Sequence, residues 1–458
     1  MQKFVFVKQI IIKNISLVFV LLLACFLVFK MFNSHRYRQP EKVIANDVIS
    51  YYAYLPATFI EHDYTLKFVE HEHRGTYWPE VLEDGTRIIK TSMGLSIMYC
   101  PFFLAANALA SPLGYEADGF TQPYAFALSL ACLFYLIVGC LFLRKVLLRH
   151  FSELTTAFTL FIVTICTNLY WYTIYEAAMS HAFSFALICV FLYLTERWHE
   201  KPAWGNSVFL GLTVGLISLI RPTNGIVVLY FLLYNVFDGK TLKDKIEIYL
   251  RNVLKIGVIA VAAILVWIPQ IMYWYSLTGH LFFYSYTDNE RFFFNHPVFL
   301  RGLFGFRKGW FIYTPSMLLG VAGFVLLFKK FKEYSWAVTV FIIVNFYIML
   351  SWWCWWYGGS CGLRAAIDCY GIMAIPIAAF LSWIGSQKIK LKIPLVCLAV
   401  ALSGLSLFHN LQYKHGAIHW DSMCKAAYFD SFGHLRQSER FQSLLQEPDY
   451  AAAKQGNR

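Results

Sequence analysis

The chain has 458 residues, of which 58% are hydrophobic, 19% aromatic and 14% charged, whereas soluble domains average about 25% charged residues. The mean hydropathy is +0.52, and the cysteines lie mostly in apolar runs, without a Cys-x-x-Cys pair. This composition excludes a soluble enzyme, a disordered chain and a disulfide scaffold. It predicts a polytopic membrane protein. The formal net charge of +12, taken alone, fits nucleic acid, anionic lipid or membrane topology.

Apolar runs that could each cross a bilayer, at about 20 residues per helix, recur along the chain. They lie near residues 14–33, 122–143, 155–173, 181–196, 206–220, 224–237, 253–274, 311–328, 336–353, 369–385 and 393–410. A further apolar run at 93–111 is ambiguous. If it does not span, the N-terminal lysines Lys3, Lys8 and Lys13 and the later basic loops all face the cytoplasm, as basic loops usually do.

We therefore expect an all-α membrane protein of about eleven transmembrane helices, with a retained N-terminal anchor, the N-terminus inside and the C-terminus outside. Residues 1–410 form the transmembrane domain, the large first outer loop covers 34–121, and 411–458 form an outer tail. Within the loop, Val48 to Ile60 can form an interfacial helix. The basic excess then reflects topology, which excludes nucleic acid as a partner.

Two candidate site residues lie in the first outer loop. Asp47 follows Asn46 at the start of the amphipathic segment, so it is a helix N-cap, a general base that deprotonates an acceptor hydroxyl, or both. Lys90 precedes Gly94, and its ammonium either snorkels to the lipid headgroups or neutralises a phosphate while Gly94 allows a chain to approach closely. Ionisable groups at membrane ends favour function because their desolvation costs energy.

An outer turn carries Glu176 and His181. They form either a hydrogen-bonded turn or a second acid and base element that faces Asp47. With Asp47 they would also make a mixed oxygen and nitrogen ligand set, but three scattered candidates do not define a site. We therefore assign no metal ligands and keep a divalent metal as an open alternative. Arg221 lies at the outer tip of a predicted hairpin over 206–237.

The segment from Arg301 to Trp310 is basic, aromatic and rich in glycine. Its cations Arg301, Arg307 and Lys308 precede a helix that begins near Phe311, which favours phosphate binding. The alternative is an interfacial anchor of tryptophan and arginine.

The aromatic run from Trp352 to Tyr357 is typical of a membrane-interface belt. Because glycines and Arg364 follow it, Trp356 is also a candidate stacking platform for a sugar ring. Arg364 and Asp368 have i,i+4 spacing and can pair with each other.

Together these segments resemble the integral-membrane GT-C glycosyltransferases, which use polyprenyl-phosphate sugars. The likeness rests on Asn46-Asp47 with Tyr51-Tyr52-Ala53-Tyr54-Leu55-Pro56, on Lys90-Thr91-Ser92-Met93-Gly94, on Ile220-Arg221-Pro222-Thr223-Asn224, on Arg307 through Tyr313 to Pro315, and on Gly358 through Asp368. The resemblance implies that Asp47 is catalytic. Val48 stands where the family often has a second acid, and the prolines that follow the lysine in bacterial members are missing after Lys90.

The resulting hypothesis is a membrane glycosyltransferase that moves a sugar from a polyprenyl-phosphate donor to a hydroxyl of a glycan, lipid or protein acceptor. Its candidate catalytic residues are Asp47, Glu176 and His181, and its candidate substrate-binding residues are Lys90, Arg221, Arg301, Arg307, Lys308, Tyr313, Trp356, Arg364 and Asp368. The resemblance implies a bacterial inner-membrane protein with its site on the periplasmic face.

Two alternatives remain open. One is a lipid or polysaccharide transporter or flippase, and the other is a polyprenyl-linked polysaccharide polymerase or ligase. The transferase hypothesis gains most if Asp47, Glu176, Arg307 and Arg364 surround one outward cavity that opens to lipid, and it fails if they scatter around the rim.

Overall fold

The computed structural model describes residues 14–70, 79–286 and 290–458, so the three N-terminal lysines used to orient the chain lie outside the described residues. The chain is mostly helical, as predicted. In the described part, strands occur as one short antiparallel ribbon of β1 (Glu80–Val81) and β2 (Arg87–Ile88).

Among the described residues, seven helical segments are long and apolar enough to cross a membrane, by length and composition. They are α2 (Ile15–Ser34), α6 (Gly94–Ala110) with η3 (Ser111–Leu113), α7 (Gln122–Leu147), α14 (Val253–Thr278), α18 (Lys332–Ser351), η6 (Arg364–Cys369) with α19 (Tyr370–Gly385), and α20 (Ile389–Lys414). These segments support a multi-pass membrane protein, whereas the count of eleven spanning helices stays a prediction.

The remaining helices of the bundle do not meet the criteria of length and apolar composition. They are α8 (Glu153–Ile165), α9 (Leu169–Ile174), α10 (Ser180–Glu200, with charged last turns), α11 (Trp204–Ile220), η4 (Pro222–Val227), α12 (Val228–Leu233), α13 (Gly239–Arg251), α15 (Phe299–Phe304), α16 (Trp310–Tyr313), η5 (Pro315–Met317) and α17 (Leu318–Lys330). The first loop adds η1 (Arg36–Arg38), α3 (Pro40–Val43), α4 (Asp47–Tyr52), α5 (Tyr54–Phe59) and η2 (Lys67–Glu70). The C-terminal segment adds α21 (Lys425–Ser431), α22 (Phe441–Leu444) and α23 (Tyr450–Lys454).

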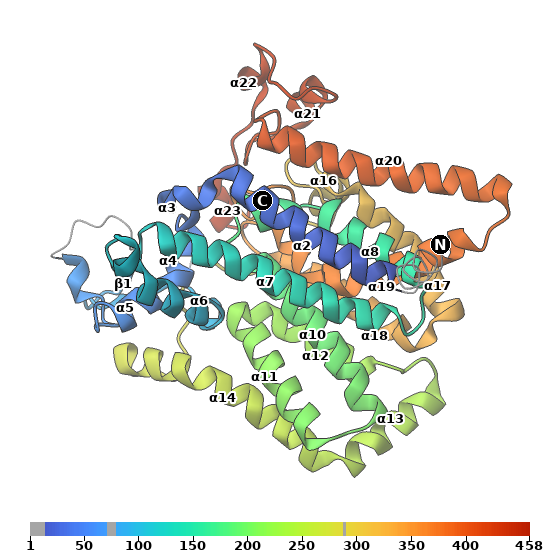
Figure 1. Ribbon diagram of the computed structural model, residues 1–458, viewed down its shortest axis with the longest axis horizontal. Coiled ribbons are helices and arrows are strands. Elements are labelled where there is room, and N and C mark those ends of the chain that lie inside the picture. Colours follow the sequence, from blue (N-terminus) through green and yellow to red (C-terminus); the bar gives the residue numbers. More distant parts are fainter. Residues whose placement is uncertain (1–13, 71–78, 287–289) are drawn as a thin grey trace, which may run out of the picture.

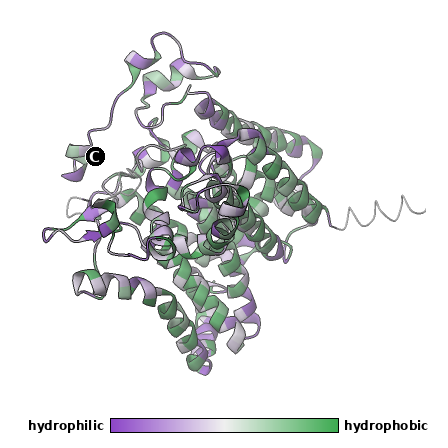
Figure 2. Ribbon diagram, turned by 60° about the vertical axis from the view of Figure 1, so that its left-hand side comes forward, coloured by the Kyte–Doolittle hydropathy of each residue, from purple (hydrophilic) through white to green (hydrophobic). Residues whose placement is uncertain are grey.

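The long helices α2, α7, α14 and α20 extend in broadly the same direction, and α3 to α6 gather at one end of them with the β-ribbon (Figure 1). Hydrophobic residues predominate along the helices, whereas hydrophilic residues gather in the loops and at helix ends (Figure 2). This distribution is the one expected of helices that lie in lipid.

Small residues bring the helix axes close together. A Cβ atom added at Gly215 of α11 would lie 2.9 Å from the Cα atom of Ala263 in α14, and one added at Gly139 of α7 would lie 2.7 Å from the Cα atom of Ala186 in α10. In lipid, where burial of apolar surface does not drive association, such close van der Waals packing is a main source of helix cohesion.

Helix α6 lies antiparallel against the first half of α7. The Tyr124 hydroxyl donates to the Asn107 Oδ1 atom at 2.6 Å, and the Tyr135 hydroxyl donates to the Met98 carbonyl at 3.2 Å. The length and composition of α6 would let it cross a membrane, but it runs beside only half of its neighbour. Whether the apolar run at 93–111 spans the membrane stays a prediction.

Two contacts identify the ends of the bundle. The ring of Phe32, near the end of α2, lies 6.1 Å from that of Phe126, near the start of α7. At the opposite end, the Arg144 Nε group donates to the Ser16 hydroxyl at 2.6 Å. The end of α2 and the start of α7 therefore lie together with the first loop, and we call this end the loop end.

Helix α11 stops short of the loop end. The Ser92 hydroxyl donates to the Leu219 carbonyl, and the backbone N–H of Met93 donates to Gln270 Oε1 at 2.7 Å. Gln270 is thus level with the last turn of α11. Helix α14 continues from there to Thr278, a further distance of about 12 Å at 1.5 Å per residue.

Candidate active site

Asp47 begins α4 and forms an ion pair with Arg364, the first residue of η6. The Arg364 Nη2 group donates to the Asp47 Oδ2 atom at 2.8 Å, and the two side chains are 15% and 45% exposed. Among the residues described around α4, no side chain caps this helix, and Asn46 holds φ at 50°. The carboxylate therefore joins two segments that are distant in sequence, and it does not act as the N-cap considered from the sequence.

Opposing effects set the charge of Asp47. Burial raises its pKa, but the attraction and the hydrogen bond of Arg364, with smaller contributions from His181 and Arg221, together hold the pKa below the ordinary value. Asp47 is therefore ionised at neutral pH. An ionised and partly exposed carboxylate can accept a proton from a bound group.

Asp368 also lies on η6, but its side chain is 2% exposed. Its Oδ2 atom accepts hydrogen bonds from Arg221 Nη1 and Asn224 Nδ2, both at 2.9 Å, and its other oxygen lies 3.6 Å from His181 Nδ1. Arg364 and Asp368 thus have separate partners, contrary to the pairing that their i,i+4 spacing allowed. The reason is that a 3₁₀-helix has three residues per turn, so residues four apart do not share a face.

The local sequence places Arg221. Helix α11 ends at Ile220, and Pro222 begins η4. A residue before proline is biased toward extended backbone, and Arg221 has φ −148° and ψ 108°. The chain therefore leaves the helix at Arg221, whose 21% exposed side chain contacts Asp368 from the tip of the expected hairpin.

Glu176 lies in the turn between α9 and α10. Its Oε1 atom accepts a hydrogen bond from Trp171 Nε1 at 2.9 Å. Burial raises the pKa of Glu176, the Trp171 bond and Arg364 oppose that rise, and the negative charge of Asp47 adds to it. Glu176 is thus both part of a hydrogen-bonded turn and within electrostatic reach of Asp47. His181 is not paired with it, because the imidazole faces the buried carboxylate of η6.

Three tyrosines near these charges were not predicted as site residues. The pKa of Tyr51 is raised by burial and then by Asp47, and Tyr286 and Tyr357 also lie within electrostatic reach of Arg221. All three are half-buried. Tyr51 could have been found, because it follows Asp47 by one helical turn and lies on the same face of α4.

We use the name loop-end polar cluster for Asp47, Glu176, His181, Arg221, Arg364 and Asp368. These six predicted residues come from four separate parts of the chain, namely α4, the α9–α10 region, the α11–η4 hairpin and η6. The cluster holds three carboxylates and two guanidinium groups.

Lys90 lies beside the cluster but is already neutralised. Its Nζ atom lies 3.1 Å from a Glu290 oxygen and 3.2 Å from a Glu80 oxygen. The ammonium is also 5.2 Å from the centre of the Tyr286 ring. A role for Lys90 in phosphate binding stays a prediction that would require these carboxylates to exchange it.

Lys308 is 1% exposed and joins three segments of the chain. Its Nζ group donates to the Trp420 carbonyl at 2.6 Å and to the Ser360 carbonyl. Burial lowers the pKa of Lys308 to about 7. Its observed contacts are those of a structural clamp.

Four other predicted residues contact neighbouring loops and the C-terminal segment. Arg301 Nη1 donates to the Arg458 carbonyl at 2.8 Å, Arg307 Nη1 donates to the Asp421 carbonyl at 2.8 Å, the Tyr313 hydroxyl donates to the Phe306 carbonyl, and Trp356 Nε1 donates to the Tyr450 hydroxyl at 3.5 Å. Trp356 is 3% exposed, which leaves no open ring face for a sugar. Arg307 therefore does not join Asp47, Glu176 and Arg364, so the arrangement that would favour the transferase hypothesis most is present for three of the four residues.

The side chains considered as metal ligands do not face one another. Asp47 pairs with Arg364, and Glu176 accepts a hydrogen bond from Trp171. His181 faces the buried carboxylate of Asp368. Over residues 14–70, 79–286 and 290–458, no group of three or more His, Cys, Asp or Glu is arranged to hold a metal ion.

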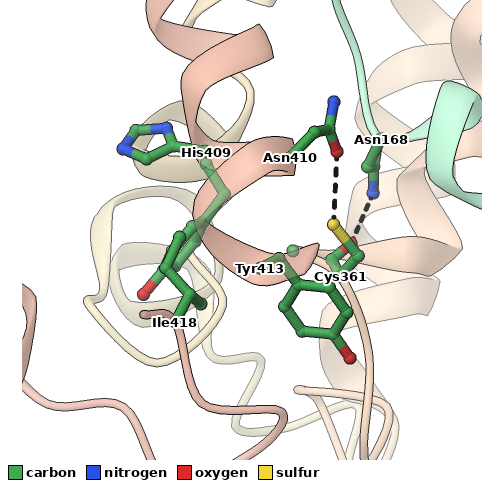
Figure 3. A pocket seen from close by; sticks show the side chains of 8 residues that line it. Asn168, Cys361, His409, Asn410, Tyr413 and Ile418 are labelled. Atoms are coloured by element: carbon green, nitrogen blue, oxygen red, sulfur yellow. Dashed lines mark hydrogen bonds between the residues drawn. The ribbon is translucent and has the colours of Figure 1, made fainter. Parts of the chain in front are cut away.

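A small cavity lies near Lys308, whose Nζ atom is 5.8 Å from the centre of the Tyr413 ring in the cavity wall. Figure 3 shows the side chains that line the cavity. It is lined by Asn168, Tyr313, Cys361, Gly362, His409, Asn410, Tyr413 and Ile418. Asn168 donates to the Cys361 carbonyl at 2.9 Å, and the Cys361 thiol donates to Asn410 Oδ1 at 3.3 Å. Its volume of about 10 Å³ suits about one water molecule, so it cannot hold a sugar.

No family model matches the sequence, and no curated protein matches it. Among solved structures, the chain is similar to the oligosaccharyltransferase AglB from Archaeoglobus fulgidus in complex with an inhibitory peptide and a dolichol-phosphate, with a TM-score of 0.47 and 13% identity over 84% of this chain and 54% of that chain. It is also similar to the apo oligosaccharyltransferase of the same organism, with a TM-score of 0.45 and 14% identity over 86% of this chain and 57% of that chain. The chain thus spans little more than half the length of these structural neighbours, and AglB is a glycosyltransferase of the GT-C superfamily.

Proposed function

We propose that this protein is a membrane glycosyltransferase that moves a sugar from a polyprenyl-phosphate donor to an acceptor hydroxyl, with Asp47 as the general base. The observation that carries the proposal is the loop-end polar cluster. There an ionised, partly exposed carboxylate lies beside two guanidinium groups in an otherwise apolar bundle. A base for the acceptor and cations for a phosphate are the parts that such a transfer needs.

The position of the cluster supports a donor that is tethered in lipid. Arg221 follows the last residue of α11, and α14 extends about 12 Å further toward the loop end. The cluster therefore lies below the end of α14. A head group that remains attached to a tail in the bilayer can reach this level from the side, through lipid.

The reaction balances with one base. The acceptor oxygen forms a bond to the anomeric carbon while its proton passes to the Asp47 carboxylate. The bond between that carbon and the phosphate oxygen breaks, and its electron pair leaves with the polyprenyl phosphate. The leaving group needs no proton because it departs as an anion, and Arg364 and Arg221 stabilise the charge that develops on it.

The other expectations extend this proposal. Glu176 is a second acidic group near Asp47, His181 and Asp368 support the cluster from behind, and a divalent metal stays an untested alternative. We place the cluster on the periplasmic side of a bacterial inner membrane, with the N-terminus in the cytoplasm. Labelling of the exposed loop at 111–121 from one side of sealed vesicles tests this orientation.

The decisive experiment uses Asp47→Asn in purified protein reconstituted with its copurified lipids. The lipids are first identified by mass spectrometry, and sugar transfer from them is then followed. We expect transfer to fall by about 10²- to 10⁴-fold, the usual contribution of general base catalysis, while polyprenyl phosphate still binds. Glu116→Gln removes an exposed carboxylate from the loop between α6 and α7 and serves as the matched control. Undiminished turnover by Asp47→Asn, or movement of lipid across the bilayer without sugar transfer, would refute the proposal.

A further inference from the structure

The two arginines of the loop-end polar cluster are held in different ways. Arg221 pairs with Asp368, which is 2% exposed and also accepts from Asn224. Arg364 pairs with Asp47, which is 45% exposed. Within the described residues, the Nε group of Arg364 is buried without a hydrogen-bond partner.

This difference determines which ion pair can open. A buried carboxylate that loses its partner is left as an uncompensated charge, which is strongly unfavourable. An exposed carboxylate that loses its partner is solvated by water, so the pair is weak. Arg221 is thus a fixed cation, and Arg364 is an exchangeable one with an unused N–H group.

The resting pair also weakens Asp47 as a base. Burial raises the pKa of Asp47, whereas Arg364 is the main group that lowers it; the net pKa lies below the ordinary value, so the carboxylate has less affinity for a proton than a free aspartate. A group that removes Arg364 from Asp47 would therefore strengthen the base. A phosphate is such a group, because guanidinium binds it through two parallel hydrogen bonds.

We propose that Arg364 passes from Asp47 to the phosphate of the donor when the donor binds, so that the donor itself activates the general base. The hydrogen bond between Arg364 Nη2 and Asp47 Oδ2 breaks, and guanidinium N–H groups of Arg364 bind the phosphate oxygens. Arg221 keeps its partner and holds the other side of the phosphate. This inference rests on the proposed function and specifies the order of its steps, in which the donor binds before the acceptor is deprotonated.

A double-mutant cycle on binding tests the exchange. The ligand is a polyprenyl phosphate without a sugar, titrated against the full-length protein in nanodiscs, and the variants are Asp47→Asn, Arg364→Gln and the two combined. Because Asp47 competes with the phosphate for Arg364, Asp47→Asn should bind the lipid at least tenfold more tightly than wild type. The gain should vanish in the Arg364→Gln background, and Glu116→Gln should bind as wild type does.

The outcomes separate this inference from the function on which it rests. Equal or weaker binding by Asp47→Asn overturns the exchange, as does a gain that persists without Arg364, which would show direct repulsion of the phosphate by Asp47. Failure of wild type both to bind the lipid and to transfer sugar overturns the proposed function itself, and this inference with it.

A kinetic readout applies to variants that fold and turn over. The acidic limb of kcat/KM reports free enzyme, whereas that of kcat reports the donor-bound enzyme. In wild type the limb of kcat should lie at the higher pH, because Arg364 has left Asp47 by then. Coincident limbs would contradict the exchange.

Discussion

The buried and the exposed ion pairs of the cluster should differ sharply in what they contribute to stability. Replacing Asp368 by Asn keeps the volume of the side chain but removes the negative charge that Arg221 and Asn224 contact. Removing one member of a buried pair typically costs about 3–5 kcal/mol. Because Arg221 is 21% exposed, water can partly solvate it, and we expect the lower end, about 3 kcal/mol. In the other pair the carboxylate is 45% exposed but Arg364 is only 15% exposed, so Asp47→Asn should cost less than Asp368→Asn, about 1–2 kcal/mol.

Thermal unfolding in detergent, followed by the fluorescence of the 14 tryptophans, measures both costs. At about 2.1 cal/mol/K per residue, unfolding 458 residues gives an entropy of about 1 kcal/mol/K. Asp368→Asn should then lower Tm by about 3 °C, or by more because membrane helices unfold incompletely, and Asp47→Asn by less, about 1–2 °C. Equal shifts for the two variants would refute the distinction between a fixed and an exchangeable arginine.

Three further predictions concern activity. Asp47 acts as a base only when ionised, and Arg364 lowers its pKa, so the kcat/KM of wild type should persist to acidic pH. Arg364→Gln should move the acidic limb of kcat/KM to higher pH. An unchanged limb would exclude Asp47 as the titrating base. Gly94→Ala should lower both activity and Tm, because its Cβ atom would lie 2.8 Å from the Cα atom of Ile220 and push the first loop from the hairpin that carries the fixed arginine; full activity would show that this contact is dispensable. Glu176→Gln preserves an acceptor for Trp171, so the Tm of this variant should stay within about 1 °C of wild type. A fall in its kcat would identify a catalytic role for the charge of Glu176. An unchanged kcat would remove Glu176 from the catalytic set.

Local sequence rules predicted the framework. Most of the apolar runs match one helix, because about 20 apolar residues satisfy both the bilayer and the backbone, whereas the runs at 155–173, 224–237 and 311–328 are each divided between shorter helices. The hairpin tip at Arg221 was predicted because a proline follows it and breaks the helix. Asp47 was identified because a carboxylate at the start of an interfacial helix is costly unless it is used.

The partners of the charged residues could not be predicted in the same way. Arg364 and Asp368 have the spacing of an α-helical pair, yet the segment is a 3₁₀-helix and they face different neighbours. Trp356 and Arg307 looked like a ligand platform, but the C-terminal segment contacts both. Lys90 was considered for phosphate binding. Its pairing with Glu290 could not be foreseen, because the two residues are 200 positions apart in sequence.

The sequence by itself determined that the chain is a helical membrane protein, because composition and periodicity act locally along the chain. It also identified the ionisable residues near the ends of the apolar runs, which contact with lipid does not explain. Only the tertiary structure decided which charges meet, since ion pairs depend on how distant helices pack and on how deeply each carboxylate is buried. Asp47 and Asp368 are the same residue type, and their positions in the fold make one an accessible base with an exchangeable partner and the other a fixed support.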